Sequence, residues 1–170
     1  MTANDNATNQ QIPFLPGTIG RPRLHKQLED STSYKLTLVS APPGYGKTTL
    51  VAEFARSTST PVLWHSVESR ERDVPNLMHH CIQVLKHRYP SIDQHLLLNE
   101  INTSNGVIRL CEYLASTVTD DLLYVLDDVH LLMGVASAEE WLRTLVEYIP
   151  PRVHLIMISR IVPTLPLTEM

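Results

Sequence analysis

The chain has 170 residues, a length that fits one domain with a single buried core. With 43% hydrophobic and 19% charged residues, its composition is that of a globular protein rather than a disordered or fibrous one. The formal net charge of -4 argues against a wrapped nucleic acid as the main partner, because such binding depends on Lys and Arg side chains that neutralise phosphates.

The two cysteines, Cys81 and Cys111, belong to no C-x-x-C or Cys/His ligand pattern. We therefore expect a reduced, intracellular protein with a cytoplasmic location. Residues 1–11 carry neither an apolar run nor a basic stretch, and no later segment reaches the roughly 18 apolar residues that span a bilayer. The sequence predicts no export signal, no membrane anchor and no membrane partner.

The eight histidines form no H-x-x-x-H or H-E-x-x-H pattern. His79 and His80 are adjacent and point to different faces of a predicted helix. The sequence therefore favours no histidine metal site, and we interpret the histidines as structural or solvated.

The chain begins with a polar segment followed by prolines and glycines. Its first residues are rich in Asn and Thr and predict disorder, and the prolines and glycines after them indicate an irregular segment. We therefore expect a disordered or irregular lead-in over residues 1–19 and one folded domain over residues 20–170. Because residues 162–170 contain two prolines and no further element, we expect this domain to be truncated relative to a longer protein.

Strands and helices are predicted to alternate along the chain. Apolar residues at helical spacing predict helices, and short apolar runs bounded by turn residues or acids predict strands. Asp73 followed by Pro75 is an N-cap arrangement for a helix. The elements, in chain order, are a helix over residues 22–30, a strand over 35–40, a helix over 48–56, a strand over 61–67, the helix after Asp73, a short helix over 95–101, a helix over 107–118, a strand over 122–126, a helix over 137–148 and a strand over 153–158.

This alternation predicts an α/β fold in three layers, with a mainly parallel sheet covered by helices on both faces and right-handed crossovers. The strand over residues 122–126 is an unbroken apolar run, which is typical of a strand buried on both faces of a parallel sheet.

Residues 41–48 read A-P-P-G-Y-G-K-T and fit the P-loop (Walker A) pattern G-x-x-x-x-G-K-[ST] except at Ala41. Gly44 and Gly46 supply conformations that a side chain would forbid, so that backbone N–H groups and a helix N-terminus face the β-phosphate. We expect Lys47 to bridge the β- and γ-phosphates and the hydroxyl of Thr48 to bind Mg²⁺. The other expected nucleotide contacts in this loop are Pro43, Tyr45 and Thr49.

Residues 122–130 read L-L-Y-V-L-D-D-V-H, an apolar strand ending in two acids, which is the form of a Walker B element. Asp127 would orient the Mg²⁺ shell, and Asp128 would polarise the attacking water as a general base. Alone the pattern is weak, because buried strands often end in solvated acids. Downstream of a P-loop it favours a nucleotide site.

Arg160 ends the last predicted strand, at the carboxyl edge of the sheet where ligands bind in open α/β folds. It could therefore contact the γ-phosphate, and the alternative is an ordinary surface arginine.

Four segments together resemble the STAND class of signal-transduction ATPases, and within it the MalT-like subgroup of LuxR-family transcriptional regulators. The resemblance covers nearly the whole chain from Gly20 to Arg160. The segments are G-R-P-R-L at 20–24, A-P-P-G-Y-G-K-T-T-L at 41–50, W-H-S-V-E followed by D-V-P within 64–75, and L-D-D-V-H at 126–130.

The resemblance implies a domain that binds ATP or ADP and whose nucleotide state controls oligomerisation. It implies that Ile19, Gly20 and Arg21 line the adenine and that Arg160 acts as a sensor. It also implies that the full-length protein self-associates and that DNA is bound only through a C-terminal helix-turn-helix, which is absent from this chain.

The resemblance also implies a strand order. In the branch of P-loop proteins with an added catalytic acid, to which Asp128 assigns this chain, a strand separates the P-loop strand from the Walker B strand. We therefore expect the order 1-4-3-2, with residues 153–158 between residues 35–40 and 122–126 and with the P-loop strand at the edge of the sheet.

Three other functions stay open at this point. A small-molecule phosphotransferase would need an acceptor pocket and a basic lid, and residues 109–170 contain no arginine-rich lid segment. A GTPase is disfavoured because the sequence contains no N-K-x-D motif. An interaction module that is stabilised by nucleotide without turnover is the third. We expect the isolated chain to hydrolyse ATP very slowly.

Overall fold

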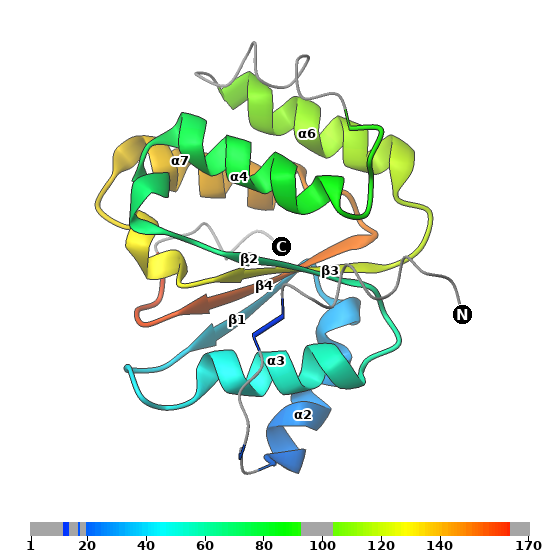
Figure 1. Ribbon diagram of the computed structural model, residues 1–170, viewed down its shortest axis with the longest axis vertical. Helices are drawn as coiled ribbons and strands as arrows, with labels where there is room; N and C mark the ends of the chain where they lie inside the picture. The colour runs from blue at the N-terminus through cyan, green and yellow to red at the C-terminus, as the bar shows by residue number, and fades with distance from the viewer. Residues whose placement is uncertain (1–11, 14–16, 18–19, 93–103, 164–170) are drawn as a thin grey trace.

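A four-stranded parallel sheet forms the centre of the molecule (Figure 1). The computed structural model describes residues 12–13, 17, 20–92 and 104–163. The strand order β1-β4-β3-β2 confirms the order 1-4-3-2 expected from the sequence. The strands are β1 (Leu36–Ser40), β2 (Val62–Ser66), β3 (Leu122–Asp127) and β4 (Val153–Ser159).

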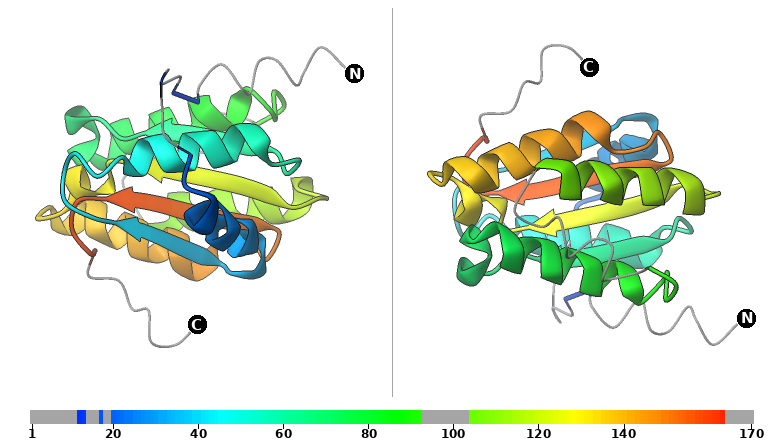
Figure 2. Two further views of the ribbon diagram at one scale, coloured as in Figure 1. Left: turned by 90° about the horizontal axis from the view of Figure 1, so that it is seen from below. Right: turned by 90° about the horizontal axis from the view of Figure 1, so that it is seen from above.

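Helices cover both faces of this sheet, which confirms the expected three-layer α/β arrangement (Figure 2). One face carries α2 (Pro22–Glu29) and α3 (Lys47–Ser57). The opposite face carries α4 (Val74–Lys86), α6 (Ser104–Thr117) and α7 (Ala136–Tyr148). Short 3-10 turns precede or follow several elements, namely η1 (Asp30–Ser33), η2 (Ser69–Arg72) and η3 (Val129–Leu132).

The observed elements follow the predicted ones closely, with the largest shift at the start of α6. This helix begins at Ser104 rather than at residue 107. Asn105 and Gly106 have low helix propensity, so the pattern of apolar residues placed the start too late. The helix predicted over residues 95–101 lies outside the described residues.

Asp73 occupies the N-cap position of α4, as predicted, but its side chain does not cap a backbone N–H. Its Oδ2 instead accepts a hydrogen bond from Nδ2 of Asn76 at 2.9 Å. Pro75 stands in the first turn, where a missing N–H has no cost.

Alternation along β2 and β3 divides the core between the two faces of the sheet. Leu63 and Tyr124 pack with α4, α6 and α7, whereas Trp64 and Val125 pack with α2 and α3. All four side chains are almost fully buried, and burying one such apolar side chain stabilises the fold by about 1.5–3 kcal/mol. The β2 and β3 strands are therefore held from both sides.

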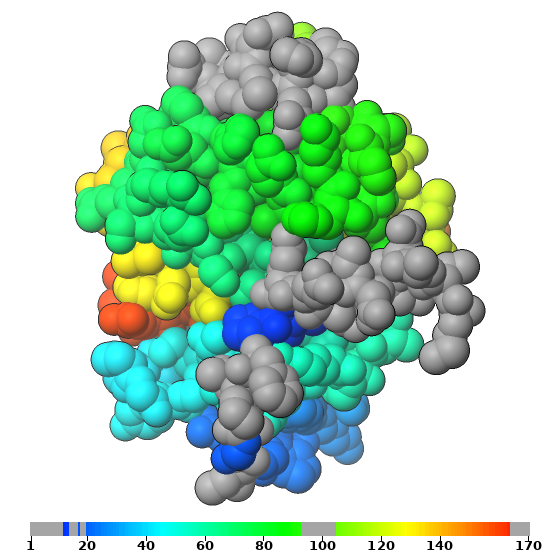
Figure 3. Space-filling model, viewed as in Figure 1, coloured from blue at the N-terminus to red at the C-terminus, as the bar shows by residue number. Residues whose placement is uncertain are grey.

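The carboxyl ends of the parallel strands meet at one edge of the sheet, on the left in Figure 1. Ser40 pairs with Ser159, and Ser66 pairs with Asp127. The loop before α3 and the turn η3 both leave from this edge (Figure 1). In the space-filling view of Figure 3, α4 in green lies above the cyan segment that enters α3.

Within the described ranges, none of the helices is both long enough and apolar enough to cross a membrane.

Candidate functional site

The loop between β1 and α3 turns sharply at two glycines. Gly44 has φ 84° and Gly46 has φ 70°, both in the left-handed region that L side chains adopt only at a cost of about 1–2 kcal/mol. A β-carbon at Gly46 would also lie 3.1 Å from Nη2 of Arg21. Gly46 is the N-cap of α3, so the loop leads directly into a helix N-terminus, where backbone N–H groups attract anions.

Two basic side chains lie against this loop. Nζ of Lys47 donates a hydrogen bond to the backbone oxygen of Pro42 at 3.0 Å. Nη1 of Arg21 donates to the backbone oxygen of Tyr45 at 2.8 Å, which ties the segment before α2 to the loop. Pro43 and the ring of Tyr45 are exposed.

Thr48 and Asp127 meet at the end of the sheet. Oγ1 of Thr48 donates to Oδ1 of Asp127 at 3.2 Å, and the backbone N–H of Asp128 donates to the same oxygen at 2.9 Å. Asp127 is buried and, within the described residues, forms no ion pair. Burial, and next the Asp128 carboxylate, raise the pKa of Asp127 to about 6. A divalent cation fits this site, because it would neutralise a buried carboxylate beside a hydroxyl oxygen.

Asp128 has φ 59°, the one positive φ of a non-glycine residue in the part of the chain that the structure describes. It is the N-cap of η3 and turns the chain away from β3. Left-handed residues of this kind gather at functional sites, where the surrounding structure holds them in place. The carboxylate of Asp128 is half-exposed and therefore accessible to a ligand.

His130 lies beside Asp128, although the sequence pattern assigned it no role beyond its place in L-D-D-V-H. Its Nδ1 lies 3.7 Å from Oδ1 of Asp128, and this buried nitrogen has no hydrogen-bond partner among the described residues. Burial, and then the positive charge of Arg160, lower the pKa of His130. A buried polar atom without a partner is uncommon and marks a place where a ligand or water would bind.

Arg160 follows directly after Ser159 at the end of β4, between β1 and β3. Its side chain is exposed, and its positive charge contributes to the lowered pKa of His130. Thr49 is half-buried in the first turn of α3, and Gly20 is exposed. Ile19 lies outside the described residues.

A cavity of about 410 Å³ adjoins the loop on the side of α2 and α3. Its volume falls in the range of small-molecule pockets in proteins. Both the loop and α2 contribute to its wall, whose residues include Arg21, Leu24, Leu28, Tyr45, Lys47 and Leu50.

The chain is homologous to curated transcriptional regulators. It is 28% identical over 169 residues to the HTH-type transcriptional regulator MalT of Yersinia pestis (strain Pestoides F) and 29% identical over 156 residues to the MalT of Vibrio cholerae. Each alignment covers 89% of this chain and 17% of the relative, so the chain spans about a sixth of the length of these regulators. No family model matches the chain.

Among solved structures, the chain is similar to C. elegans PCH-2. The TM-score is 0.45 at 15% identity, and the alignment covers 86% of this chain and 38% of that one.

Proposed function

We propose that residues 20–170 form the ATP/ADP-binding switch domain of a MalT-like, STAND-class transcriptional regulator. The observation that carries the proposal is the contact between Thr48 and Asp127, 3.2 Å apart at the end of a glycine-rich loop. A hydroxyl and a carboxylate so placed beside a helix N-terminus form the protein half of a magnesium nucleotide site.

The phosphates would bind at the loop. Gly44 and Gly46 have positive φ, so that backbone N–H groups line the turn, and Lys47 adds a positive charge at the start of α3. Among the described residues, Nζ of Lys47 donates to a backbone oxygen of the same loop, so a change of rotamer would let it bind a phosphate oxygen instead.

Thr48 and Asp127 would hold Mg²⁺, which neutralises charge on the phosphates when bound. Asp128 and His130 lie just beyond, where Asp128 would accept a proton from the attacking water. The 3.7 Å separation of the two side chains leaves His130 able to orient Asp128 or a water beside it. Arg160 would bind the γ-phosphate and sense its loss.

The adenine would occupy the cavity of about 410 Å³ beside the loop. Its wall combines apolar side chains of α2 and α3 with Arg21, and Ile19 and Gly20 precede it in the sequence. The guanidinium of Arg21, which bonds to the backbone oxygen of Tyr45, would connect base binding to the phosphate loop.

In the whole protein, nucleotide state would control self-association and activation. Specific DNA binding would require a helix-turn-helix beyond this chain, as in the regulators to which it is homologous. Such a protein would act in the cytoplasm, and the domain alone would turn over ATP very slowly.

Titration calorimetry of the chain with ATP, ADP and GTP, with and without Mg²⁺, tests the proposal. We expect Mg²⁺-dependent binding of both adenine nucleotides and weaker binding of GTP. Lys47→Ala should abolish measurable binding, because it removes the charge that faces the phosphates. Lys86→Ala is the control, since Lys86 lies on α4 on the opposite face of the sheet. Equal ATP affinity of Lys47→Ala and the unchanged protein would refute the proposal.

A further inference from the structure

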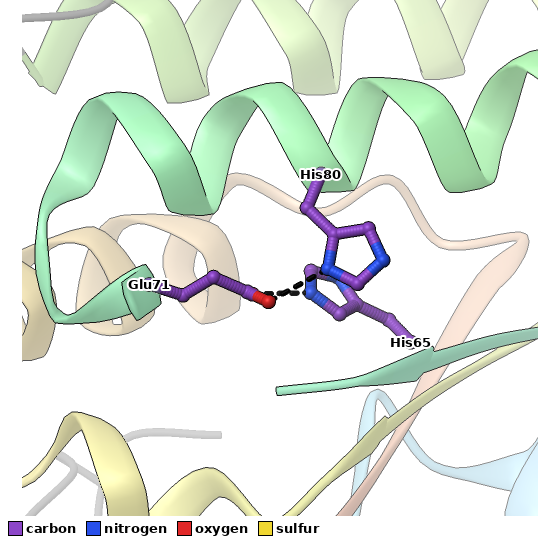
Figure 4. Close-up of side chains that lie close together, drawn as sticks. All are labelled: His65, Glu71 and His80. Atoms are coloured by element: carbon purple, nitrogen blue, oxygen red, sulfur yellow. Dashed lines mark hydrogen bonds and ion pairs between the residues drawn. The ribbon is translucent and has the colours of Figure 1, made fainter. Parts of the chain in front are cut away.

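Three side chains of types that can bind metal ions converge on the sheet face that α4 covers, opposite α3. His65 comes from β2, Glu71 from the turn η2 and His80 from α4 (Figure 4). Nε2 of His65 lies 2.6 Å from Oε2 of Glu71, and Nδ1 of His80 lies 2.7 Å from Oε1 of Glu71. One ligand atom from each of the three residues lies within 4.8 Å of the other two.

The carboxylate at the centre of this cluster is deeply buried. The side chains of Glu71 and His65 have no exposed surface, and that of His80 is 28% exposed. Among the described residues, both ion pairs of Glu71 are with these imidazoles, and no Lys or Arg pairs with it. A carboxylate at such depth requires a charged partner or a full set of hydrogen-bond donors.

A second layer of polar groups supports His65. Its Nδ1 lies 3.0 Å from the hydroxyl of Tyr124, which lies 3.0 Å from Sγ of Cys81. Both Tyr124 and Cys81 are buried. A metal-binding histidine almost always has such a partner on its other ring nitrogen, where it fixes the orientation of the ring.

Glu71 has a partner of its own besides the two imidazoles. The backbone N–H of Glu68 donates to its Oε1 at 3.1 Å, as part of a capping box at the start of η2. The carboxylate is thereby held in place independently of the histidines.

We propose that His65, Glu71 and His80 form a binding site for one divalent transition-metal ion, and that Zn²⁺ is the preferred ion. Two imidazole nitrogens and one carboxylate oxygen are a ligand set that zinc takes in proteins, with a water in the fourth position. The exposed side of His80 provides the route of entry and the place of that water.

The ligand atoms lie within 4.8 Å of one another, and their separations must adjust to those of a tetrahedral ion. Ligand bonds of about 2.0–2.1 Å in a tetrahedron separate the ligand atoms by roughly 3.3 Å. The contact of the oxygen that binds the ion, which is 2.6 Å for Oε2 with His65 or 2.7 Å for Oε1 with His80, would therefore lengthen by roughly 0.6–0.7 Å. His80 stands on the outer layer of helices and can move outward by rotating its side chain.

The hydrogen bonds around His65 can rearrange to suit the ion without any net change in protons. With the ring proton on Nε2, His65 donates to Glu71 and accepts from the Tyr124 hydroxyl. With the ring proton on Nδ1, Nε2 offers its lone pair to the metal, His65 donates to Tyr124, and Tyr124 donates to Cys81. In both arrangements His65, Tyr124 and Cys81 keep their hydrogen bonds to one another, because a hydroxyl and a thiol can each donate or accept.

Zinc titration of the chelator-treated, tag-free chain in the absence of nucleotide tests the site. We expect one Zn²⁺ per chain, and we expect Co²⁺ in its place to give the intense visible absorption of a tetrahedral site. Zn²⁺ should also raise the unfolding temperature, since it binds the folded state alone.

Two neighbouring histidines supply a matched pair of variants. His80→Ala should lower zinc affinity by more than about tenfold and abolish the cobalt absorption. His79→Ala should leave both unchanged, because His79 is exposed and, among the described residues, its hydrogen-bond contact is with Gln83. Equal zinc affinity in His80→Ala and His79→Ala would overturn the proposal, as would the absence of stoichiometric binding to the unchanged chain.

A third variant tests the supporting layer without removing a ligand. Tyr124→Phe keeps the buried ring and deletes the hydroxyl that orients His65, so zinc affinity should fall by about 10- to 100-fold. Circular dichroism of the metal-free variants establishes that each is folded. A Tyr124→Phe chain that is folded and binds zinc as tightly as the unchanged chain would contradict the role of Tyr124 and the site built on it.

Discussion

Oγ1 of Thr48 donates a hydrogen bond to Oδ1 of Asp127 at 3.2 Å, which joins the first turn of α3 to the end of β3 across 79 residues of sequence. The carboxylate that accepts this bond is buried, and burial together with the Asp128 charge raises the pKa of Asp127 to about 6. Without a cation beside it, an ionised Asp127 therefore destabilises the folded chain.

Asp127→Asn should stabilise the nucleotide-free chain by about 1–3 kcal/mol at pH 7. An aspartate whose pKa is higher in the folded state stabilises the fold while protonated, and this contribution is lost as the pH rises from 3.8 to about 6. The variant should thus gain little at pH 4 and most above pH 6. Urea unfolding across this range measures the difference, and Asp120→Asn, at an exposed position, is the control. The same variant should bind Mg²⁺-nucleotide more weakly. A stability difference that does not change with pH would show that the Asp127 charge is not its cause.

Gly46→Ala should destabilise the chain by about 1–2 kcal/mol and abolish nucleotide binding. The new β-carbon would stand in left-handed backbone and 3.1 Å from Nη2 of Arg21. Gly134→Ala is a matched control, because Gly134 has φ 78° with open space around it. Both variants should lose stability in thermal unfolding, but calorimetry should detect a loss of nucleotide affinity in Gly46→Ala alone. A similar affinity loss in both variants would mean that strain, rather than the shape of the loop, is responsible.

Two substitutions of Asp128 should separate the effect of backbone conformation on stability from the effect of the carboxylate on hydrolysis. Asn adopts left-handed backbone readily, so Asp128→Asn should fold normally and keep its nucleotide, whereas Asp128→Ala should lose about 1 kcal/mol of stability. In a longer protein that turns over ATP, both variants should lose hydrolysis, because the carboxylate that polarises water is gone. Phosphate release and urea unfolding report the two effects separately. Normal hydrolysis by Asp128→Asn would exclude Asp128 as the general base.

Glu71→Gln should destabilise the chain by about 2–4 kcal/mol at neutral pH. Burial opposes ionisation of this carboxyl, but hydrogen bonds from His65 and His80 outweigh it and lower the pKa of Glu71 to about 2. The carboxylate therefore contributes stability above pH 4.5, and that contribution is lost as the pH falls toward 2. Urea unfolding from pH 7 to pH 3 should show the gap between the two proteins narrowing. Glu112→Gln, at an exposed position, should show no such gap.

Local sequence patterns predicted most of the elements because the strands are continuous apolar runs and the helices bury residues at helical spacing. Leu77, Cys81 and Leu85, for example, stand at helical spacing in the sequence, and all three are fully buried. The strand order was beyond any local pattern and came from the resemblance, through the second acid Asp128. It is confirmed by the pairing of β4 with both β1 and β3.

The cluster around Glu71 was not predictable from spacing. Its three residues come from a strand, a turn and a helix, and only the packing of α4 against β2 brings them together. In the sequence Glu71 stands between Arg70 and Arg72, which is typical of a solvated charge, yet it has no exposed surface. The environment of His130 was not predictable for a similar reason. The burial of its Nδ1 without a hydrogen-bond partner among the described residues depends on the surrounding fold.

The backbone N–H of Val67 donates to the carbonyl oxygen of Asp127 at 2.9 Å, so the end of β2 and the residue proposed to bind Mg²⁺ share one hydrogen bond. The histidine cluster begins at His65, which lies in β2 two residues before Val67. Coupling free energies between two sites are reciprocal. If an ion held by His65 stiffens this strand end and thereby changes nucleotide affinity by some factor, nucleotide must change the affinity for that ion by the same factor. Ion binding at His65 and nucleotide binding at Asp127 would then be coupled through the end of β2, without any movement of the domain as a whole.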